Sequence, residues 1–253
     1  MRITALLTLI LLPVIAFSET LEETRLFELS THDIQSLKIY CGSGFLTVIG
    51  AKGIDQISAT ARIEVRGIKA NEFQHYLQTQ LQLSLKKQGK DAVLQAELKD
   101  SFQRGIEANI DLSVIVPKAL NVTIEDGSGP IIVTNLSGSL QVDDNSGKID
   151  IINTQGNLKI KDGSGGINIQ DVSGNIEVQD GSGEIKIGLV KGDVTITDAS
   201  GSITIQDIDG NVTVTDDSGS IEIYQVTQNV FIRQAGSGSL EIEGVKGKVT
   251  TRE

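Results

Sequence analysis

Apolar residues in the second half of the chain recur in units of nine residues that read Gly-x-[Ile/Val/Leu]-x-[Ile/Val/Leu]-x-x-x-x. The glycines that open every second unit are spaced by 18 without exception: Gly129, Gly147, Gly165, Gly183, Gly201 and Gly219. Two apolar residues at i and i+2 lie on one face of a strand, and the polar residue between them lies on the other. Each unit is therefore predicted to be a short strand with one dry face.

A strand of this length cannot bury its apolar pair alone, so the repeats are predicted to stack on one another. A turn of 18 residues holds two such units, and hence two strands and two corners. Successive turns about 4.8 Å apart would place equivalent Ile and Val side chains in continuous columns. The fold class predicted for residues 121–253 is all-β: a flattened parallel β-solenoid (β-helix) of about seven turns.

The two corners of each turn differ in chemistry. One carries an inward apolar residue in most turns, such as Leu136 or Val190. The other reads Asp-x-Ser-Gly and repeats Asp126, Asp144, Asp162, Asp180, Asp198 and Asp216. We expect these aspartates to cap a solvated corner. Calcium is a weaker alternative, because one Asp per turn supplies few of the six to eight oxygens that the ion prefers.

The segment before the repeats is organised differently. Residues 1–18 combine Arg2, a short apolar run and the small-x-small sequence Ala16-Phe17-Ser18, as in a secretory signal peptide. Residues 19–120 are predicted to be a strand-rich region that caps the N-terminal end of the stack. It contains one short helix over Lys69–Gln80, followed by a hairpin around Gly89. No transmembrane segment is expected in the mature chain.

Charge and cysteine content narrow the possible partners. The net charge of −11 disfavours nucleic acid and anionic membrane surfaces, which require clustered Lys and Arg. The single Cys41 rules out an internal disulfide framework and is expected to be buried. Lys246, Lys248 and Arg252 place charge near the last repeat, which should discourage pairing of strand edges there.

The sequence resembles a known bacterial family. Strand-like segments lead to Ile110-Asp-Leu-Ser-Val-Ile-Val-Pro117, followed by repeated Ser-Gly-x-Ile-x-[Ile/Val] units and by the interposed Gly174-Asn-Ile and Gly210-Asn-Val. This arrangement is similar to the putative-adhesin β-strand-repeat domain family, which is GIN-head-like and largely of unknown function. The resemblance implies a β-solenoid and an adhesin-like role, and it carries across no catalytic residues.

Residues with chemical potential are few. His32 and His75 are far apart in sequence, and Asp217-Ser-Gly219 is one member of a repeated corner, so no catalytic, metal or cofactor site is predicted. Among outward apolar residues, Ile132 and Ile152 are expected to pack under the N-terminal segment. Tyr224 and Phe231 are the candidate interaction surface.

These observations favour a non-enzymatic exported binding or scaffold protein of the cell envelope, whose partner is an envelope protein or glycan. A periplasmic location is preferred to secretion or the cell surface. Two alternatives stay open: a polysaccharide-acting β-helix enzyme, and a structural envelope-stress accessory protein. The minimal turns leave almost no loop that could hold acid and base groups, which counts against the enzyme.

Overall fold

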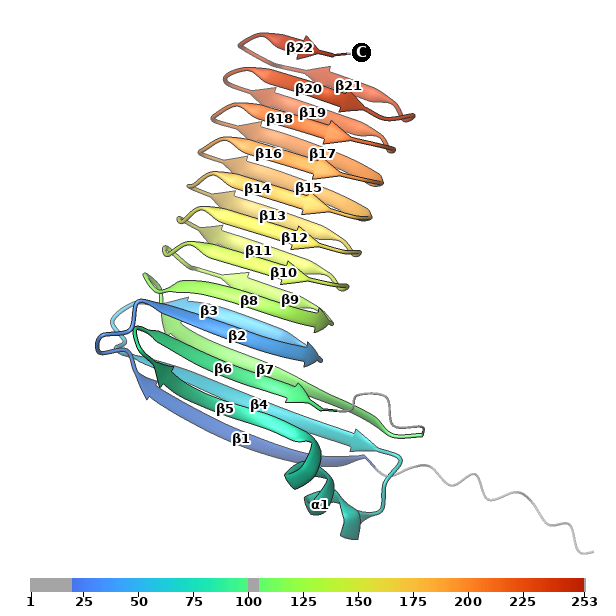
Figure 1. Cartoon of the computed structure of the whole chain (residues 1–253). Coiled ribbons are helices and arrows are strands. Elements are labelled where there is room, and N and C mark those ends of the chain that lie inside the picture. The colour runs from blue at the N-terminus through green and yellow to red at the C-terminus, as the bar shows by residue number, and fades with distance from the viewer. Residues whose placement is uncertain (1–19, 100–104, 253) are drawn as a thin grey trace, which may run out of the picture.

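The structure is a computed structural model that describes residues 20–99 and 105–252. The proposed signal peptide, residues 1–18, lies outside the described residues. Two 11-stranded sheets lie face to face and run the length of the molecule (Figure 1). Among the described residues, no helix has the length and apolar character of a membrane span.

The first sheet, called sheet A, contains in spatial order β1 (Leu21–Ser30), β4 (Gln56–Arg66), β7 (Glu107–Pro117), β3 (Leu46–Ala51), β9 (Ile131–Thr134), β11 (Ile149–Thr154), β13 (Ile167–Val172), β15 (Gly183–Val190), β17 (Gly201–Ile208), β19 (Ile221–Val226) and β21 (Leu240–Glu243). The opposite sheet, sheet B, contains β5 (Leu81–Gln88), β6 (Asp91–Leu98), β2 (Ser36–Ser43), β8 (Asn121–Ser128), β10 (Leu140–Asp144), β12 (Leu158–Asp162), β14 (Ile176–Asp180), β16 (Val194–Asp198), β18 (Val212–Asp216), β20 (Val230–Ala235) and β22 (Val249–Thr251). From β8 onward the chain alternates between the sheets, so that one strand of each makes a coil.

Neighbouring coils pair in parallel and in register with the 18-residue repeat. Ile185, for example, lies between Ile167 and Ile203. The repeat glycines also lie above one another: a Cβ on Gly183, whose φ is +146°, would approach the carbonyl oxygen of Gly165 within 1.5 Å. The fold prediction is therefore confirmed, with stacked coils forming a β-solenoid of about seven turns.

The solenoid core is filled by aliphatic columns from both sheets. The apolar residues at the first corner are buried with them, as predicted: Leu136, Val172, Val190, Ile208 and Val226. The residue before each of them has a positive φ, from Asn135 at 62° to Gln225 at 56°, which turns the chain sharply enough to aim the next side chain inward. Cys41 is buried as expected, and burial raises the pKa of its thiol.

The N-terminal strands extend the same two sheets. Strands β2 and β3 pair in parallel with β8 and β9, and thus make a coil of their own. Beyond them, β4 and β1 join sheet A in antiparallel fashion, and β5 forms the expected hairpin with β6. The domain boundary at residue 120 stays a prediction, because strands on both of its sides share each sheet.

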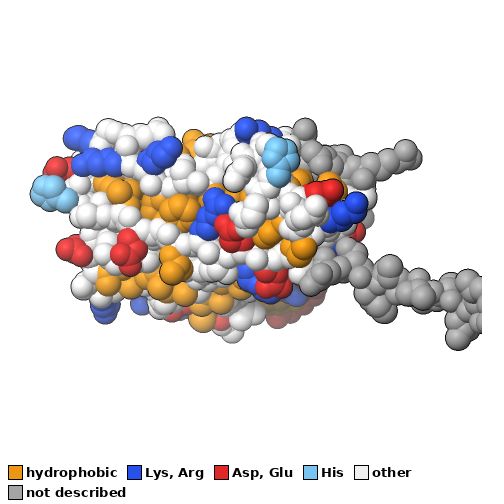
Figure 2. All heavy atoms as spheres, turned by 90° about the horizontal axis from the view of Figure 1, so that it is seen from below, with side chains coloured by type: hydrophobic (Ala, Val, Ile, Leu, Met, Phe, Trp, Pro, Cys, Tyr) orange, Lys and Arg blue, Asp and Glu red, His pale blue; other side chains and the backbone are white. Residues whose placement is uncertain are grey.

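The single helix of the described residues, α1 (Ala70–Gln80), lies at the N-terminal end of the stack (Figure 1). It agrees with the predicted helix to within one residue and buries Phe73, Tyr76 and Leu77. Figure 2 looks at this end of the molecule, where hydrophobic side chains are interspersed with charged ones of both signs. This end is therefore partly covered by the chain itself.

Candidate functional site

A row of isoleucines lies on the outer face of sheet A. Ile115 of β7 pairs with Ile49 of β3, Ile49 with Thr134 of β9, and Thr134 with Ile152 of β11. Ile132 lies on the same face of β9, diagonal to Ile49 and Ile152. We call Ile49, Ile115, Ile132 and Ile152 the isoleucine patch.

The isoleucine patch is exposed to solvent. The exposed fractions of Ile115 and Ile152 are 40% and 41%, and Ile49 and Ile132 are half-buried. The expectation that Ile132 and Ile152 pack under the N-terminal segment is wrong. The N-terminal strands continue the sheet edge to edge instead of crossing its face, so they leave these side chains uncovered.

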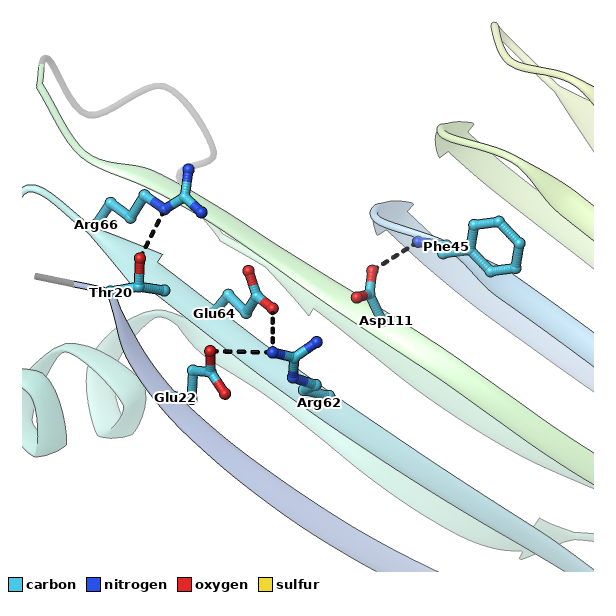
Figure 3. A network of polar contacts seen from close by, with 7 residues as sticks. All are labelled: Thr20, Glu22, Phe45, Arg62, Glu64, Arg66 and Asp111. Atoms are coloured by element: carbon cyan, nitrogen blue, oxygen red, sulfur yellow. Dashed lines mark hydrogen bonds and ion pairs between the residues drawn. The ribbon is translucent and has the colours of Figure 1, made fainter.

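Charged groups lie on the same outer face of sheet A, four residues along β7 from Ile115 on one side and beside Ile132 on the other. Toward β1, Arg62 contacts Glu22 at 3.0 Å and Glu64 at 2.8 Å, and Asp111 accepts a hydrogen bond from the Phe45 backbone N–H at 2.9 Å (Figure 3). The two carboxylates raise the pKa of the Arg62 guanidinium, chiefly through the hydrogen bond that the guanidinium donates to Glu22. The face thus has an apolar centre with a polar rim.

On that rim, toward the repeats, Asp150 holds Lys148 at 2.8 Å and accepts a hydrogen bond from the Asn168 amide at 3.1 Å. The rim side chains are thereby fixed in place by one another. An ordered polar border around an apolar centre is the arrangement found in protein–protein contacts.

The outer face of sheet B carries an open groove of about 570 Å³, lined by both polar and apolar residues. One wall is a ladder in which a side-chain carbonyl or carboxylate oxygen accepts the backbone N–H of the next coil. Asn157 accepts from Asn175 at 3.0 Å, Asn175 from Asp193 at 3.0 Å, and Asp193 from Asn211 at 2.8 Å. The floor presents Thr123, Gln141 and Thr195, together with the ion pair of Lys159 and Glu177 at 2.9 Å.

Tyr224 and Phe231, the residues expected to form an interaction surface, lie on different sheets. Tyr224 belongs to β19 in sheet A and Phe231 to β20 in sheet B, so their outward side chains face opposite sides of the molecule. Phe231 is 39% exposed. Partial burial and a hydrogen bond with Glu241 raise the pKa of the Tyr224 phenol. The structure does not bring the pair together, and a binding role for either residue stays a prediction.

The corner aspartates are buried, and the expectation of a solvated corner is wrong. Asp126, Asp144, Asp162, Asp180, Asp198 and Asp216 are at most 7% exposed. In the last five, Oδ1 accepts the backbone N–H of the serine two residues later, at 3.0 to 3.2 Å. Oδ2 of all six is buried with no hydrogen-bond partner among the described residues. We call these six side chains the aspartate column.

Burial changes the titration of the aspartate column. It raises the pKa of each of the first five carboxyls, from Asp126 to Asp198, from 3.8 to about 6. The charges of neighbouring column members add to this effect from Asp144 onward. Burial also raises the pKa of Asp216. Within the parts of the chain that the structure describes, no three His, Cys, Asp or Glu side chains are grouped so that they could hold a metal ion.

Comparison with known proteins identifies likenesses of fold. No protein-family model matches the chain, and no curated protein sequence matches it either. Two similar solved structures are a putative cell adhesion protein from Clostridium sporogenes (TM-score 0.35, 10% identity, covering 91% of this chain and 100% of that one) and a putative adhesin from Parabacteroides merdae (TM-score 0.35, 15% identity, 91% and 97%). A third is a putative lipid binding protein from Parabacteroides distasonis (TM-score 0.38, 15% identity, 92% and 97%).

Proposed function

We propose that the protein is an exported, non-enzymatic binding protein or scaffold of the cell envelope, and that the isoleucine patch contacts a protein partner. The observation that carries the proposal is a group of four isoleucines, two exposed and two half-buried, on the mostly polar outer face of sheet A. Contiguous apolar surface with a polar rim typically marks a site of protein association. Export is supported by the signal-like sequence of residues 1–18, and we prefer the periplasm as the location.

Rigidity favours this use of the patch. Each isoleucine lies on a strand that is paired on both sides, so its backbone is fixed before a partner arrives. A preformed surface loses little conformational freedom on binding. The surface is also flat, as a sheet face must be, which suits another folded protein better than a small ligand that needs a concave pocket.

Replacing two patch residues tests the proposal. We expect the variant Ile132→Ser/Ile152→Ser to remain folded, because both side chains lie outside the core, and to lose the binding partner. Wild type and variant, each immobilised, are incubated with a detergent-free envelope extract of the source bacterium, and the captured proteins are quantified by mass spectrometry. The expected result is one or a few proteins depleted at least about tenfold, since losing two apolar anchors costs about 2 kcal/mol or more.

The matched control is Thr204→Ser/Gln206→Ser, which changes the same outer face of sheet A on β17, three strands away from β11 of the patch. It should capture the same proteins as wild type. Equal capture by all three proteins would refute the role of the isoleucine patch.

The groove on sheet B favours a second candidate, the binding of an envelope glycan. Its hydroxyl, amide and charged groups recur every coil, about 4.8 Å apart, which is close to the length of one sugar unit in an extended chain. We expect Gln141→Ala/Lys159→Ala to weaken binding to such a glycan at least about tenfold, as loss of several hydrogen bonds would. Isothermal titration with soluble envelope oligosaccharides measures this, and Lys186→Ala on sheet A is the control. Absence of any binding by wild type would eliminate this candidate.

A further inference from the structure

The C-terminal end of the solenoid has two open strand edges. Strand β21 is the last strand of sheet A and β22 the last of sheet B, and each has a neighbour on one side only within the described residues. Both strands belong to the same coil and run in opposite directions (Figure 1). Their outer backbone groups are therefore available for pairing with a further strand.

The same coil leaves core residues uncovered. Leu240 of β21 continues the inner column of Ile221, and Val249 of β22 continues that of Val230. Leu240 is 40% exposed and Val249 is 47% exposed, whereas Ile221 and Val230 one coil earlier are buried. Covering them would remove apolar surface from water, which is favourable.

The outer faces of the two edges carry opposite charge. Glu241 and Glu243 lie on β21, and Glu241 lies directly beside Glu222 of the preceding coil. Lys248 and Arg252 flank β22 on its outer side, two residues either side of Thr250. None of these five charged side chains forms an ion pair within residues 20–99 and 105–252. Like charges side by side on a sheet are unfavourable, and opposite charges are favourable.

We propose that two copies of the chain associate through this end, with β21 of each copy pairing antiparallel with β22 of the other. A two-fold axis parallel to the strands produces this arrangement. It places the end of each copy's sheet A beside the end of the second copy's sheet B. The two strands of each new pair then run antiparallel. The pairing is self-complementary, as a two-fold interface requires.

The proposed register satisfies both faces of each new strand pair. On the inner face, Ile242 lies opposite Val249 of the second copy and Leu240 opposite Thr251, which joins the two cores. In that register Glu243 lies opposite Lys248 on the outer face, and Glu241 lies opposite Thr250 and diagonal to Arg252, within reach of its long side chain. The basic residues of β22 would repel a second β22, but they attract β21 of the second copy because that edge is acidic.

The opposite end of the solenoid is a poorer occupant for this site. There the last strands, β1 and β5, approach each other, and α1 packs beside β5. The outer side of β1 presents Glu22 and Glu28, which would repel the acidic edge of β21. Association through one end of each copy also closes after two copies, whereas head-to-tail stacking would give open filaments.

Charge-reversal variants test the dimer. The full mature chain is measured by sedimentation equilibrium at protein concentrations up to about 200 µM, because an interface of two short strand pairs is small and should be weak. We expect wild type to reach twice the monomer mass. Glu241→Lys/Glu243→Lys and Lys248→Glu/Arg252→Glu should each be monomeric, and an equimolar mixture of these two variants should recover the dimer. Higher salt should weaken the association.

Two further proteins make the result decisive. Lys52→Glu/Lys191→Glu reverses exposed lysines elsewhere and should dimerise as wild type does. The variant that carries all four edge reversals restores complementary charge and should dimerise with itself. A wild type that stays monomeric, or filaments instead of dimers, would overturn the proposal, as would charge-reversed variants that dimerise alone.

Discussion

The variant Ile205→Asp is expected to lose cooperative folding. Ile205 lies in β17, is fully buried, and continues a column between Ile187 and Ile223. An aspartate there would place a carboxyl among aliphatic side chains that offer it no hydrogen-bond donor. It would also remove a packed aliphatic side chain. We expect a loss of about 4 kcal/mol or more in the free energy of unfolding, which is comparable with the stability of a typical domain.

Thermal and urea unfolding followed by far-UV circular dichroism measure this effect. The control is Thr204→Asp, one residue earlier in the same strand, whose side chain faces outward between Lys186 and Glu222. This control should melt within a few degrees of wild type, because surface substitutions change stability by about 0.5 kcal/mol. If Ile205→Asp melts cooperatively near the wild-type temperature, the inward assignment of the column is wrong.

The repeated part of the fold can be predicted from the sequence because its period determines its register. When apolar pairs recur every 18 residues, only stacking in step puts each pair beside its equivalents, as Ile167, Ile185 and Ile203 show. A shift by one residue would expose every aliphatic side chain to water. The glycines add a second constraint, because only glycine fits where the backbones of neighbouring corners approach.

The burial of the aspartate column could also have been predicted. In β12, Leu158, Ile160 and Asp162 occupy alternate positions, so the aspartate continues the inward face of its own strand. The polar Asp-x-Ser-Gly motif suggested a solvated turn, because aspartates are seldom fully buried. Here the strand includes the aspartate as its last residue, whereas the motif suggested that the turn begins there. The alternation of the strand therefore points the carboxyl inward.

Only half of the isoleucine patch could be predicted from the repeats, which place Ile132 and Ile152 in outward positions. Ile115 and Ile49 are 66 positions apart in sequence and meet only because β7 inserts between β4 and β3. The N-terminal strands lack the 18-residue period, so nothing local specifies which of them lie beside the first coil. Their alternation predicts strands but not their partners.

Acidification from pH 7.5 to pH 5 is expected to stabilise the protein. Because burial raises the pKa of five column carboxyls to about 6, the folded chain binds their protons more tightly than the unfolded chain, in which they titrate near 3.8. This stabilisation is complete below about pH 4 and is lost as the pH rises through about 6. Glu23 and Asp91 have pKa values lowered by their hydrogen-bond partners, Gln74 and Lys38 respectively, so they stay ionised across this interval.

Amide variants isolate the contribution of the column. Asp162→Asn/Asp180→Asn keeps the acceptor oxygen for the serine N–H and removes two groups that must otherwise ionise while buried. We expect this variant to be more stable than wild type at pH 7.5, by about 1 kcal/mol for each site, and to gain less on acidification. Differential scanning calorimetry at pH 5 and 7.5 gives both quantities.

The control for the column is Asp171→Asn/Asp207→Asn, which changes one exposed and one half-buried carboxyl at the opposite corner of the coils. It removes the same two formal charges, so general repulsion in this acidic chain falls equally, but it should leave the pH dependence as in wild type. A wild-type melting temperature that is unchanged or lower at pH 5 would contradict the expectation. So would an equal effect of Asp171→Asn/Asp207→Asn, because the pH dependence would then arise from net charge and not from carboxyls enclosed between the coils.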